Sequence, residues 1–405
     1  MKPIVRAGRM KPVHSDIRGP LFVEAMKRQK QGIDILKLNT GNPATFGFGL
    51  PDSIKNALME HMQDGVGYCD FKGMPQARQA ICDYETSKGI KGITSDDVFI
   101  GNGVSEVVSF ALTPLLNDGD EVLVPSPSYS LWGNSVYLED GKPVFYTCDE
   151  QANWYPDIKD IRSKITDKTK AIVIINPNNP TGVLYPKEIL LEIIQVAREF
   201  GLLIFADEIY DRLVMDGKQH ISLASLTEDV PVITLNGLSK SHCLCGYRCG
   251  WMVISGPREL TEDYRQGIIQ LTSLRLCANT LAQIVIPAAL DDMETPASMV
   301  RPGGRIYEQR EATVRELEKI DGLSFVKNDA AFYVFPKLDV KKFNITNDKQ
   351  FAHDLLDATN ILLVPGSGFD WKDPDHFRIV MLPQADILSD AIRRMGTFLD
   401  GYKQK

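Results

Sequence analysis

The sequence predicts an α/β fold, with a large domain built on a mainly parallel sheet, helices on both faces of that sheet, and a smaller α+β domain. Three observations lead to this prediction. Short apolar runs alternate with longer amphipathic stretches through the middle of the chain. Most of the short runs are apolar throughout, which is typical of parallel strands buried on both faces. After Pro302, Gly303 and Gly304 a long charged stretch and scattered short segments replace this alternation.

The apolar runs give the strands of the large domain. We expect strands at residues 97–100, 121–124, 171–175, 202–206, 232–235 and 251–254. The clearest intervening helix spans residues 187–200, because Pro186 precedes it and Gly201 follows it. Its apolar stripe consists of Leu190, Ile193, Ile194 and Ala197. Repeated strand–helix–strand units of this kind predict a parallel sheet.

The smaller domain draws on both ends of the chain. A charged helix is expected at residues 306–320, followed by ordered segments at 331–335, 350–358, 361–364 and 377–381. A helix at residues 20–31 is expected to join them. We therefore divide the chain into an N-terminal arm with part of the small domain (1–42), the large domain (43–290) and the C-terminal small domain (291–405). The large domain would be inserted between the two halves of the smaller one.

Composition and charge exclude several classes of protein. The 405 residues include 45 Lys and Arg against 53 Asp and Glu, a net charge of −8. Such an acidic chain has no general electrostatic attraction to nucleic acid or to anionic membranes. No apolar run approaches the length needed to cross a bilayer, and the N-terminal residues lack the apolar region of a signal peptide. These features predict a cytoplasmic protein.

The seven cysteines predict neither a disulfide framework nor a metal site. Their number is odd and their density is low, which argues against structural disulfides. Cys243, Cys245 and Cys249 lie close together, but the ligand spacing of a zinc site is absent. We expect no bound metal, and we interpret these three residues as free thiols without an assigned chemistry.

Polar segments follow four of the predicted strands. They are GNGVSE at 101–106, NPNNPTG at 176–182, DEIY at 207–210 and NGLSK at 236–240. In open parallel sheets, ligands bind beyond the carboxyl ends of the strands. The four segments therefore predict a binding site at this edge of the sheet.

Gly103, Val104 and Ser105 begin a predicted helix in the first of these segments. Free backbone N–H groups, the helix dipole and a serine hydroxyl together form an anion site suited to phosphate. The alternative is a capped helix after a glycine-containing turn. The chain contains no complete GxGxxG and no GK[ST] motif, so neither a dinucleotide fingerprint nor a Walker loop is predicted.

Asp207 follows an apolar strand directly, and Lys240 comes shortly after another. A buried aspartate needs a cationic partner or strong donors, and the alternative is a carboxylate that caps a helix or pairs with an arginine. A lysine in such a place can lose its proton and form a Schiff base with a carbonyl, and the alternative is a surface lysine. A phosphate site, a buried acid and a buried lysine together fit pyridoxal 5′-phosphate (PLP).

The sequence resembles the fold-type I, class I/II PLP-dependent aminotransferases, and among them the bacterial alanine aminotransferases. The resemblance extends over nearly the whole chain. Its motifs are DIRGP (16–20), GNPATFGF (41–48), GYCDFKG (67–73), GNGVSE (101–106), NPNNPTG (176–182), FADEIYD (205–211), NGLSK (236–240), GYRCGW (246–251) and FRIV (377–380). It implies a seven-stranded, mainly parallel sheet in the large domain and a homodimer with the active site at the subunit interface.

The resemblance also implies roles for the residues around the cofactor ring. Lys240 would join PLP as a Schiff base and later move the α-proton of the substrate. Asp207 would pair with the protonated pyridine nitrogen, which keeps the ring an electron sink. Asn179 and Tyr210 would bind the 3-oxygen of the ring, and Tyr129 would stack on its face.

For the phosphate, the resemblance implies contacts from Val104, Ser105 and Arg248, with Tyr68 reaching across from the neighbouring subunit. The sequence departs from the family pattern at one position. Many members carry a phosphate-binding serine three residues before the lysine, where this chain has Gly237. Ser239, directly before Lys240, is the expected substitute.

The substrate would be held by its carboxylates. Arg378 would bind the α-carboxylate as a bidentate fork, helped by the backbone of Gly41 and the amide of Asn179, because charge-assisted bidentate pairs are strong. Arg18 is the candidate partner for the second carboxylate of glutamate. The alternative is a structural arginine that caps the helix at residues 20–31.

The predicted reaction is a ping-pong transamination in which L-alanine and 2-oxoglutarate give pyruvate and L-glutamate. An aminotransferase for aspartate or aromatic amino acids, or a carbon–sulfur β-lyase of the same fold, remains an alternative. A PLP-sensing transcriptional regulator would need an N-terminal DNA-binding domain, for which the residues before Gly41 leave no room.

Overall fold

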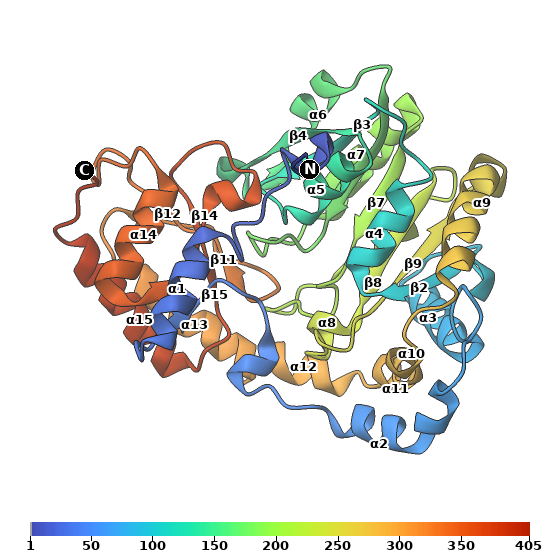
Figure 1. Ribbon diagram of the computed structural model, residues 1–405, viewed down its shortest axis with the longest axis horizontal. Coiled ribbons are helices and arrows are strands. Elements are labelled where there is room, and N and C mark those ends of the chain that lie inside the picture. The colour runs from blue at the N-terminus through green and yellow to red at the C-terminus, as the bar shows by residue number, and fades with distance from the viewer. Residues whose placement is uncertain (1) are drawn as a thin grey trace.

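The computed structural model describes residues 2–405 and contains a large central sheet (Figure 1). Its eight strands run in the order β2-β9-β8-β7-β6-β3-β4-β5. Strands β4, β3, β6, β7 and β8 are parallel, whereas β9 is antiparallel to β2 and to β8. The bounds are β2 Val98–Asn102, β3 Glu121–Ser126, β4 Lys142–Asp149, β5 Tyr155–Pro156, β6 Thr169–Ile175, β7 Leu203–Asp207, β8 Val232–Gly237 and β9 Cys249–Ser255.

The predicted sheet is confirmed, with two additions. All six predicted runs lie in strands whose ends differ from the prediction by a residue or two. Strand β4 completes the expected seven, and the two-residue β5, antiparallel to β4, adds an eighth. No continuous apolar run marks β4, because Lys142 at its start is exposed and its burial alternates along the strand.

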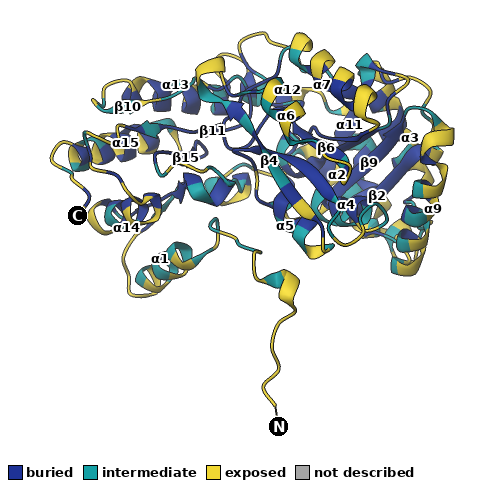
Figure 2. Cartoon of the chain, turned by 90° about the horizontal axis from the view of Figure 1, so that it is seen from above, coloured by how far each residue is buried: buried dark blue, intermediate teal, exposed yellow. Residues whose placement is uncertain are grey.

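Both faces of the sheet are buried. Ile172 and Ile174 of β6 pack into the core under α7, whereas the alternate residues Val173 and Ile175 pack into the core under α4, α5 and α9. Figure 2 shows the buried strands between partly exposed helices. Because successive strand residues point to opposite faces, two buried faces require an apolar residue at nearly every position.

The large region contains eleven of the α-helices. They are α2 Asp52–His61, α3 Pro75–Ser87, α4 Val104–Leu112, α5 Leu131–Leu138, α6 Ile158–Lys164, α7 Lys187–Phe200, α8 Leu238–Ser241, α9 Arg258–Arg275, α10 Thr280–Ile284, α11 Ile286–Asp291 and α12 Glu294–Val300. The predicted helix at 187–200 is confirmed at both ends. Gly201 ends it in the left-handed conformation with a φ of 66°, which favours glycine.

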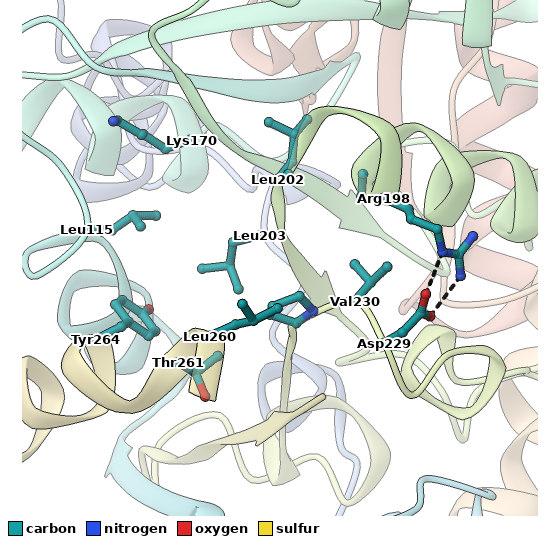
Figure 3. A pocket seen from close by; sticks show the side chains of 13 residues that line it. Leu115, Lys170, Arg198, Leu202, Leu203, Asp229, Val230, Leu260, Thr261 and Tyr264 are labelled. Atoms are coloured by element: carbon teal, nitrogen blue, oxygen red, sulfur yellow. Dashed lines mark hydrogen bonds and ion pairs between the residues drawn. The ribbon is translucent and has the colours of Figure 1, made fainter. Parts of the chain in front are cut away.

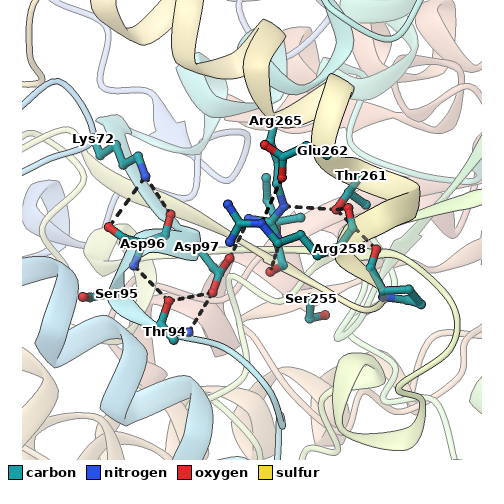
Figure 4. Close-up of polar contacts among 12 residues, drawn as sticks. Lys72, Thr94, Ser95, Asp96, Asp97, Ser255, Arg258, Thr261, Glu262 and Arg265 are labelled. Atoms are coloured by element: carbon teal, nitrogen blue, oxygen red, sulfur yellow. Dashed lines mark hydrogen bonds and ion pairs between the residues drawn. The ribbon is translucent and has the colours of Figure 1, made fainter.

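A buried ion pair anchors α9 to the start of β2 (Figure 4). Arg265 Nη1 donates to Asp97 Oδ1 at 2.6 Å, and Arg265 Nη2 donates to the Ile254 carbonyl at 3.1 Å. The other carboxylate oxygen of Asp97 accepts from the backbone N–H and the hydroxyl of Thr94. Both carboxylate oxygens of Asp97 thus accept hydrogen bonds. The buried ion pair holds α9 and the start of β2 in a fixed relative position.

The smaller region combines residues from both ends of the chain, as expected. Its core packs Phe351 and Leu388 against Phe377 and Ile379. The elements are α1 Pro20–Lys30, β1 Leu36–Lys37, α13 Arg305–Leu317, β10 Leu323–Ser324, β11 Tyr333–Val334, β12 Lys337–Leu338, α14 Asp348–Thr359, β13 Ile361–Leu362, β14 Val364–Pro365, β15 Phe377–Val380 and α15 Ala385–Leu399. The domain boundaries at residues 42 and 290 stay a prediction.

The N-terminal segment is tied to the C-terminal region by a short parallel pair. Leu36 lies opposite Ile361 and Lys37 opposite Leu362. Residues 2–9, in contrast, are exposed and extend away from the body of the molecule (Figure 2). The seven 3₁₀ turns are Gly8–Met10, Pro43–Phe46, Met62–Gly65, Ser95–Asp97, Glu150–Ala152, Leu223–Leu226 and Gly366–Phe369.

Within residues 2–405, no single helix has the length and hydropathy to cross a membrane. The pair formed by Arg258–Arg275 and Thr280–Asp291 meets the requirement only when the two are counted together, and they are bent by 119° with respect to each other.

Candidate active site

The four polar segments come together at the carboxyl edge of the sheet. Asp207, the last residue of β7, lies opposite Ile175 of β6 on one side and Leu235 of β8 on the other. The NPNNPTG segment therefore begins beside Asp207, and the NGLSK segment begins on its other side. Strand β2 delivers the GNGVSE segment to the same edge, because β2 runs antiparallel to β9, which is itself antiparallel to β8.

The Asp207 carboxylate is buried and has only neutral donors. Asp207 is 5% exposed. Trp132 Nε1 donates to Oδ2 at 3.1 Å, and the backbone N–H of Ile209 donates to Oδ1 at 3.4 Å. Burial raises the pKa of Asp207 from 3.8 to about 6. A cationic ligand against this carboxylate would restore its ionised form.

Lys240 lies on α8, the single helical turn that follows β8. Its Nζ donates to the Gly41 carbonyl at 2.9 Å and lies 3.9 Å from the Cys245 Sγ. Burial by itself lowers the pKa of Lys240, but neighbouring polar groups, Tyr333 foremost, raise it above the usual value. Without a ligand this amine is therefore a buried cation held by a backbone carbonyl.

An anion cradle forms where α4 begins. Gly103, with a φ of 84°, precedes the first helical residue, Val104. Arg248 Nη2 donates to Ser105 Oγ at 3.1 Å. A Cβ on Gly103 would overlap the Arg248 guanidinium, and a Cβ on Gly250 would overlap the Val104 backbone nitrogen. The two glycines thus let an arginine lie directly against the free N–H groups of a helix start, where phosphate binds.

Arg378 is buried without an anionic partner. It is 1% exposed, Nη1 donates to Asn179 Oδ1 at 2.9 Å, and Nη2 donates to the Asn39 carbonyl. Its guanidinium lies between the rings of Tyr333 and Phe369, each with its centroid 4.6 Å away. Nε has no hydrogen-bond partner among the described residues, and burial lowers the pKa of this arginine. A buried guanidinium of this kind is a receptor for a carboxylate.

Tyr210 and Asn179 line the space between these groups. Tyr210 is 3% exposed, and its hydroxyl lies 2.8 Å from the hydroxyl of Tyr333. Burial raises the pKa of Tyr210 well above its usual range. Gly41 closes this space from the N-terminal side, since a Cβ on Gly41 would overlap the Tyr333 hydroxyl.

Tyr129 and Tyr68 are more exposed than the other predicted site residues. Tyr129 is 38% exposed and lies near enough to affect the pKa values of Lys240 and Arg378. Tyr68 is 84% exposed. The chain by itself therefore does not bring Tyr68 into the cluster.

Arg18 lines a cavity next to the site. The cavity has a volume of about 410 Å³ and also contacts Thr40, Asn42 and Phe46, which follow or flank Gly41. Gly19 is the N-cap residue of α1 and makes no side-chain cap hydrogen bond, and a structural role for Arg18 at this helix stays the alternative. Arg18 is exposed and available to a ligand in the cavity.

Gly237 has a steric reason to be glycine. A Cβ at this position would lie 2.5 Å from the Cys249 carbonyl oxygen on the neighbouring strand β9. A serine cannot be placed here without moving β8 or β9. Ser239 is 9% exposed, and its carbonyl accepts from the Cys245 thiol. The use of Ser239 for phosphate stays a prediction.

Two site residues were not predicted from the sequence, Trp132 and Tyr333. Trp132 is the only side chain that donates to the Asp207 carboxylate among the described residues, and Tyr333 contacts both Arg378 and Tyr210. Tyr333 lies within an apolar stretch and looks like a core residue, whereas Trp132 lies between Ser130 and Asn134 without a motif that marks it. The weak signal was the spacing of Trp132, three residues after Tyr129, which places both on one side of a helical turn.

The acidic groups beyond Asp207 form an ion-pair network. Glu208, Asp211 and His220 have their ligand atoms within 4.8 Å of one another. Lys88 Nζ contacts Glu85 at 2.7 Å, Glu208 at 2.8 Å and Asp211 at 3.2 Å. One lysine offsets only part of the charge of three carboxylates, and burial raises the pKa of Glu85, which favours its neutral form.

A second cavity lies at the opposite edge of the sheet (Figure 3). It has a volume of about 410 Å³ and is lined by Leu203 and Pro231, where β7 begins and where the chain approaches β8. Its charged residue Arg198 is paired with Asp229 through two contacts of 2.6 and 2.8 Å. None of the predicted site residues lines this cavity.

The fold brings Asp207, Lys240 and Arg378 together at the carboxyl edge of an α/β sheet, an arrangement typical of an enzyme active site. The model of the family "Aminotransferase class I and II" matches residues 33–392. The chain belongs to this family of aminotransferases.

Several relatives match the chain over its full length. A glutamate-pyruvate aminotransferase, AlaA, of Haemophilus influenzae is 49% identical over 404 residues, which cover 100% of both chains. The crystal structure of an aminotransferase from Escherichia coli superposes with a TM-score of 0.98, at 46% identity and 100% coverage of both chains. An alanine aminotransferase from Pyrococcus furiosus superposes with a TM-score of 0.93, at 40% identity, covering 98% of this chain and 99% of that chain.

Proposed function

We propose that the protein is a PLP-dependent alanine aminotransferase that converts L-alanine and 2-oxoglutarate to pyruvate and L-glutamate. The observation that carries this proposal is the buried Arg378, whose guanidinium has no anionic partner and lies within the cluster that contains Lys240. A receptor for a carboxylate next to a reactive amine suits an α-amino or α-keto acid. The relatives named for glutamate, pyruvate and alanine support the choice of substrates.

The residues present fit PLP. Asp207 is a buried carboxylate with neutral donors only, which suits a ligand that carries a cationic ring nitrogen. Arg248, Ser105 and the backbone N–H of Val104 form a cradle that suits a phosphate. When bound, PLP supplies an aldehyde that links to amines and a ring that withdraws electrons from the α-carbon of the substrate.

The side chains of the chain would do the remaining work. Lys240 Nζ would hold the cofactor and, once freed, would accept the proton of the substrate α-carbon and pass it to the cofactor carbon. Asp207 stays ionised opposite the ring nitrogen. Tyr210 and Asn179 bind the 3-oxygen, and Tyr129 covers the ring face. Exclusion of water by these buried side chains strengthens each charge-assisted contact.

We infer that substrates are oriented by two arginines. Arg378 holds the α-carboxylate that every amino and keto acid carries. Arg18, exposed on the wall of the cavity next to Gly41, would reach the second carboxylate of glutamate or 2-oxoglutarate. An exposed arginine can turn away when alanine, which has only a methyl group, occupies the site. The alanine methyl would then contact the apolar side chains that line this cavity.

A homodimer is also part of the proposal. Tyr68 would reach the phosphate cradle of the neighbouring subunit, which accounts for its 84% exposure in the single chain. Apolar side chains near it, including Met62, Val66 and Leu281, are exposed as well. Thr280 Oγ1 donates to the Gly65 carbonyl at 2.6 Å, so the turn before Tyr68 and α10 form one surface. Burial of this apolar surface against a second copy would favour association.

The test is a visible absorption spectrum of the purified protein with PLP, recorded before and after L-alanine is added. We expect the band of the lysine-linked cofactor to disappear with L-alanine and to return with 2-oxoglutarate. Lys240→Ala is the control, since it removes the linking amine. A band that L-alanine leaves unchanged would refute alanine as the donor, and L-aspartate, L-tyrosine and L-cystathionine would then identify the alternatives. No band at all would refute the cofactor assignment.

A further inference from the structure

Tyr333 joins two parts of the site that come from different regions of the chain. It lies on β11, next to the Arg378 strand β15, and its backbone pairs with Val380. Its hydroxyl is 2.8 Å from the hydroxyl of Tyr210, which follows β7 of the large sheet. Its ring face covers the Arg378 guanidinium at 4.6 Å. Tyr333 is 2% exposed, so both contacts are shielded from water.

We propose that Tyr333 is a positioning residue of this site: its hydroxyl orients the Tyr210 hydroxyl toward the cofactor, and its ring holds the Arg378 guanidinium for the substrate carboxylate. The inference rests on the proposed function, because it needs Tyr210 to face the cofactor 3-oxygen and Arg378 to face the substrate.

The direction of the hydrogen bond follows from counting protons. A phenol has one proton to donate and two lone pairs to accept with. If Tyr210 donates its proton to the cofactor oxygen, it can only accept from Tyr333, so Tyr333 is the donor of the pair. A hydroxyl that accepts one hydrogen bond becomes a stronger donor in the next. Tyr333 therefore strengthens the contact of Tyr210 with the cofactor.

The ring of Tyr333 acts on Arg378. Two aromatic faces, Tyr333 and Phe369, lie on the guanidinium at equal distances of 4.6 Å. The side-chain amide of Asn179 and the carbonyl of Asn39 take up two of its N–H groups in plane. These contacts fix the orientation of the planar guanidinium, and Nε is still without a partner among the described residues. A guanidinium that is oriented in this way does not need to rearrange when it binds a carboxylate.

Tyr333 also lies close to Gly41, the residue whose carbonyl accepts from Lys240. A Cβ on Gly41 would overlap the Tyr333 hydroxyl, and the Gly41 carbonyl is the acceptor of Lys240 Nζ at 2.9 Å. The titratable groups that face this phenol are Tyr210, Lys240 and Arg378, with Tyr129, Cys245 and Asp207 behind them. A change in the Tyr333 hydroxyl is therefore expected to act through Tyr210, its only hydrogen-bond partner among the described residues.

The test compares Tyr333→Phe, which keeps the ring, with Tyr333→Leu and Tyr333→Met, which remove it. Tyr146→Phe is the matched control, because it removes a buried tyrosine hydroxyl that donates to the Val173 carbonyl inside the sheet. The first measurement is the pH midpoint of the visible absorption of bound PLP. A donor on the cofactor oxygen stabilises the deprotonated cofactor, so Tyr333→Phe should raise this midpoint by about half a unit to one unit.

The second measurement is the dissociation constant of 2-methylalanine, which has a carboxylate and an amine but no α-proton and so gives no turnover. Tyr333→Phe should change it by less than about twofold, whereas Tyr333→Leu or Tyr333→Met should weaken binding about fivefold or more through loss of the ring face. Either of the two ring-removing variants suffices, so failure of one to fold does not stop the test.

Two results would overturn the proposal. One is a pH midpoint of Tyr333→Phe that equals that of Tyr146→Phe and of the wild type. The other is unchanged binding of 2-methylalanine after removal of the ring. Failure of the wild type to develop a visible band with PLP is a different result, which overturns the proposed function and, with it, this inference.

Discussion

Replacement of Asp207 by asparagine should stabilise the protein when no cofactor is bound. Burial raises the pKa of Asp207 from 3.8 to about 6, and its donors, Trp132 Nε1 and a backbone N–H, are neutral. One pKa unit corresponds to about 1.4 kcal/mol, so the ionised carboxylate costs the folded chain about 3 kcal/mol at pH 8. The Asp207→Asn side chain carries no charge, but its single oxygen can accept from only one of these two donors. Loss of the other hydrogen bond costs about 1 kcal/mol, which leaves a net gain of about 2 kcal/mol.

The cost appears in a defined range of pH. Because the pKa of Asp207 is higher in the folded than in the unfolded chain, the folded protein binds more protons between pH 3.8 and about 6. Its free energy of unfolding, relative to that of Asp207→Asn, therefore falls as the pH rises through this window. Above about pH 6 the difference in free energy of unfolding between the two proteins stays constant. Below about pH 4 the part of this difference that comes from the charge disappears.

The assay is thermal unfolding of the cofactor-free protein at pH 8. From the usual unfolding entropy per residue, a chain of this length changes its midpoint by about 1 °C per kcal/mol, so Asp207→Asn should unfold about 2 °C higher. The control is Asp216→Asn, where the Arg310 guanidinium at 2.6 Å holds the pKa of the carboxyl below its usual value. That variant should unfold at a lower temperature. An equal or lower midpoint for Asp207→Asn would refute the reasoning.

Addition of PLP should reverse the order of the two proteins. A cationic ring nitrogen against Asp207 would recover the cost of burying the carboxylate, so the wild type should gain more stability from PLP than Asp207→Asn. Equal gains in the two proteins would mean that Asp207 does not face a cationic group of the cofactor.

Three further predictions concern substrates and packing. Arg378→Ala should lower kcat/KM for every amino and keto acid by about 100-fold or more, since it removes a buried charge-assisted contact; a normal kcat/KM would contradict the carboxylate assignment. Arg18→Ala should lower kcat/KM for L-glutamate and 2-oxoglutarate about fivefold while sparing L-alanine and pyruvate; equal losses would remove its role. Gly237→Ser should destabilise the protein by about 1–3 kcal/mol, because its Cβ would lie 2.5 Å from the Cys249 carbonyl, and an unchanged unfolding midpoint would contradict this close contact.

The sequence was most informative where one element carries its own signals. Residues 187–200 have a proline before them, a glycine after them and a helical apolar stripe between, and the helix has these bounds in the structure. Strand β4 has no such signal, because its exposed Lys142 and its alternating burial come from its place near the edge of the sheet. The edge is set by tertiary pairing, which a local pattern does not contain.

The site could be predicted to the extent that its residues are unusual in sequence. Asp207 ends an apolar strand and Lys240 follows another within a few residues, and ionisable residues at the buried ends of strands indicate function. Tyr333 was missed because an aromatic residue within an apolar stretch is normally core, and Trp132 was missed because a lone tryptophan between Ser130 and Asn134 carries no motif. Their importance lies in single polar atoms, the Nε1 that bonds Asp207 and the hydroxyl that bonds Tyr210, and only the folded chain brings those atoms together.

The parallel pair of β1 with β13 has a consequence for biosynthesis. The segment around β1 is made early by the ribosome, yet its partners come much later: Leu36 lies opposite Ile361, the Asn39 carbonyl accepts from Arg378, and the Gly41 carbonyl accepts from Lys240. A nascent chain can build much of the central sheet before these partners emerge, while Leu36 and Leu38 still lack their burial. We expect this segment, although it is synthesised early, to be the last to adopt its folded structure. The contacts around Lys240 would then be complete only when translation is nearly finished.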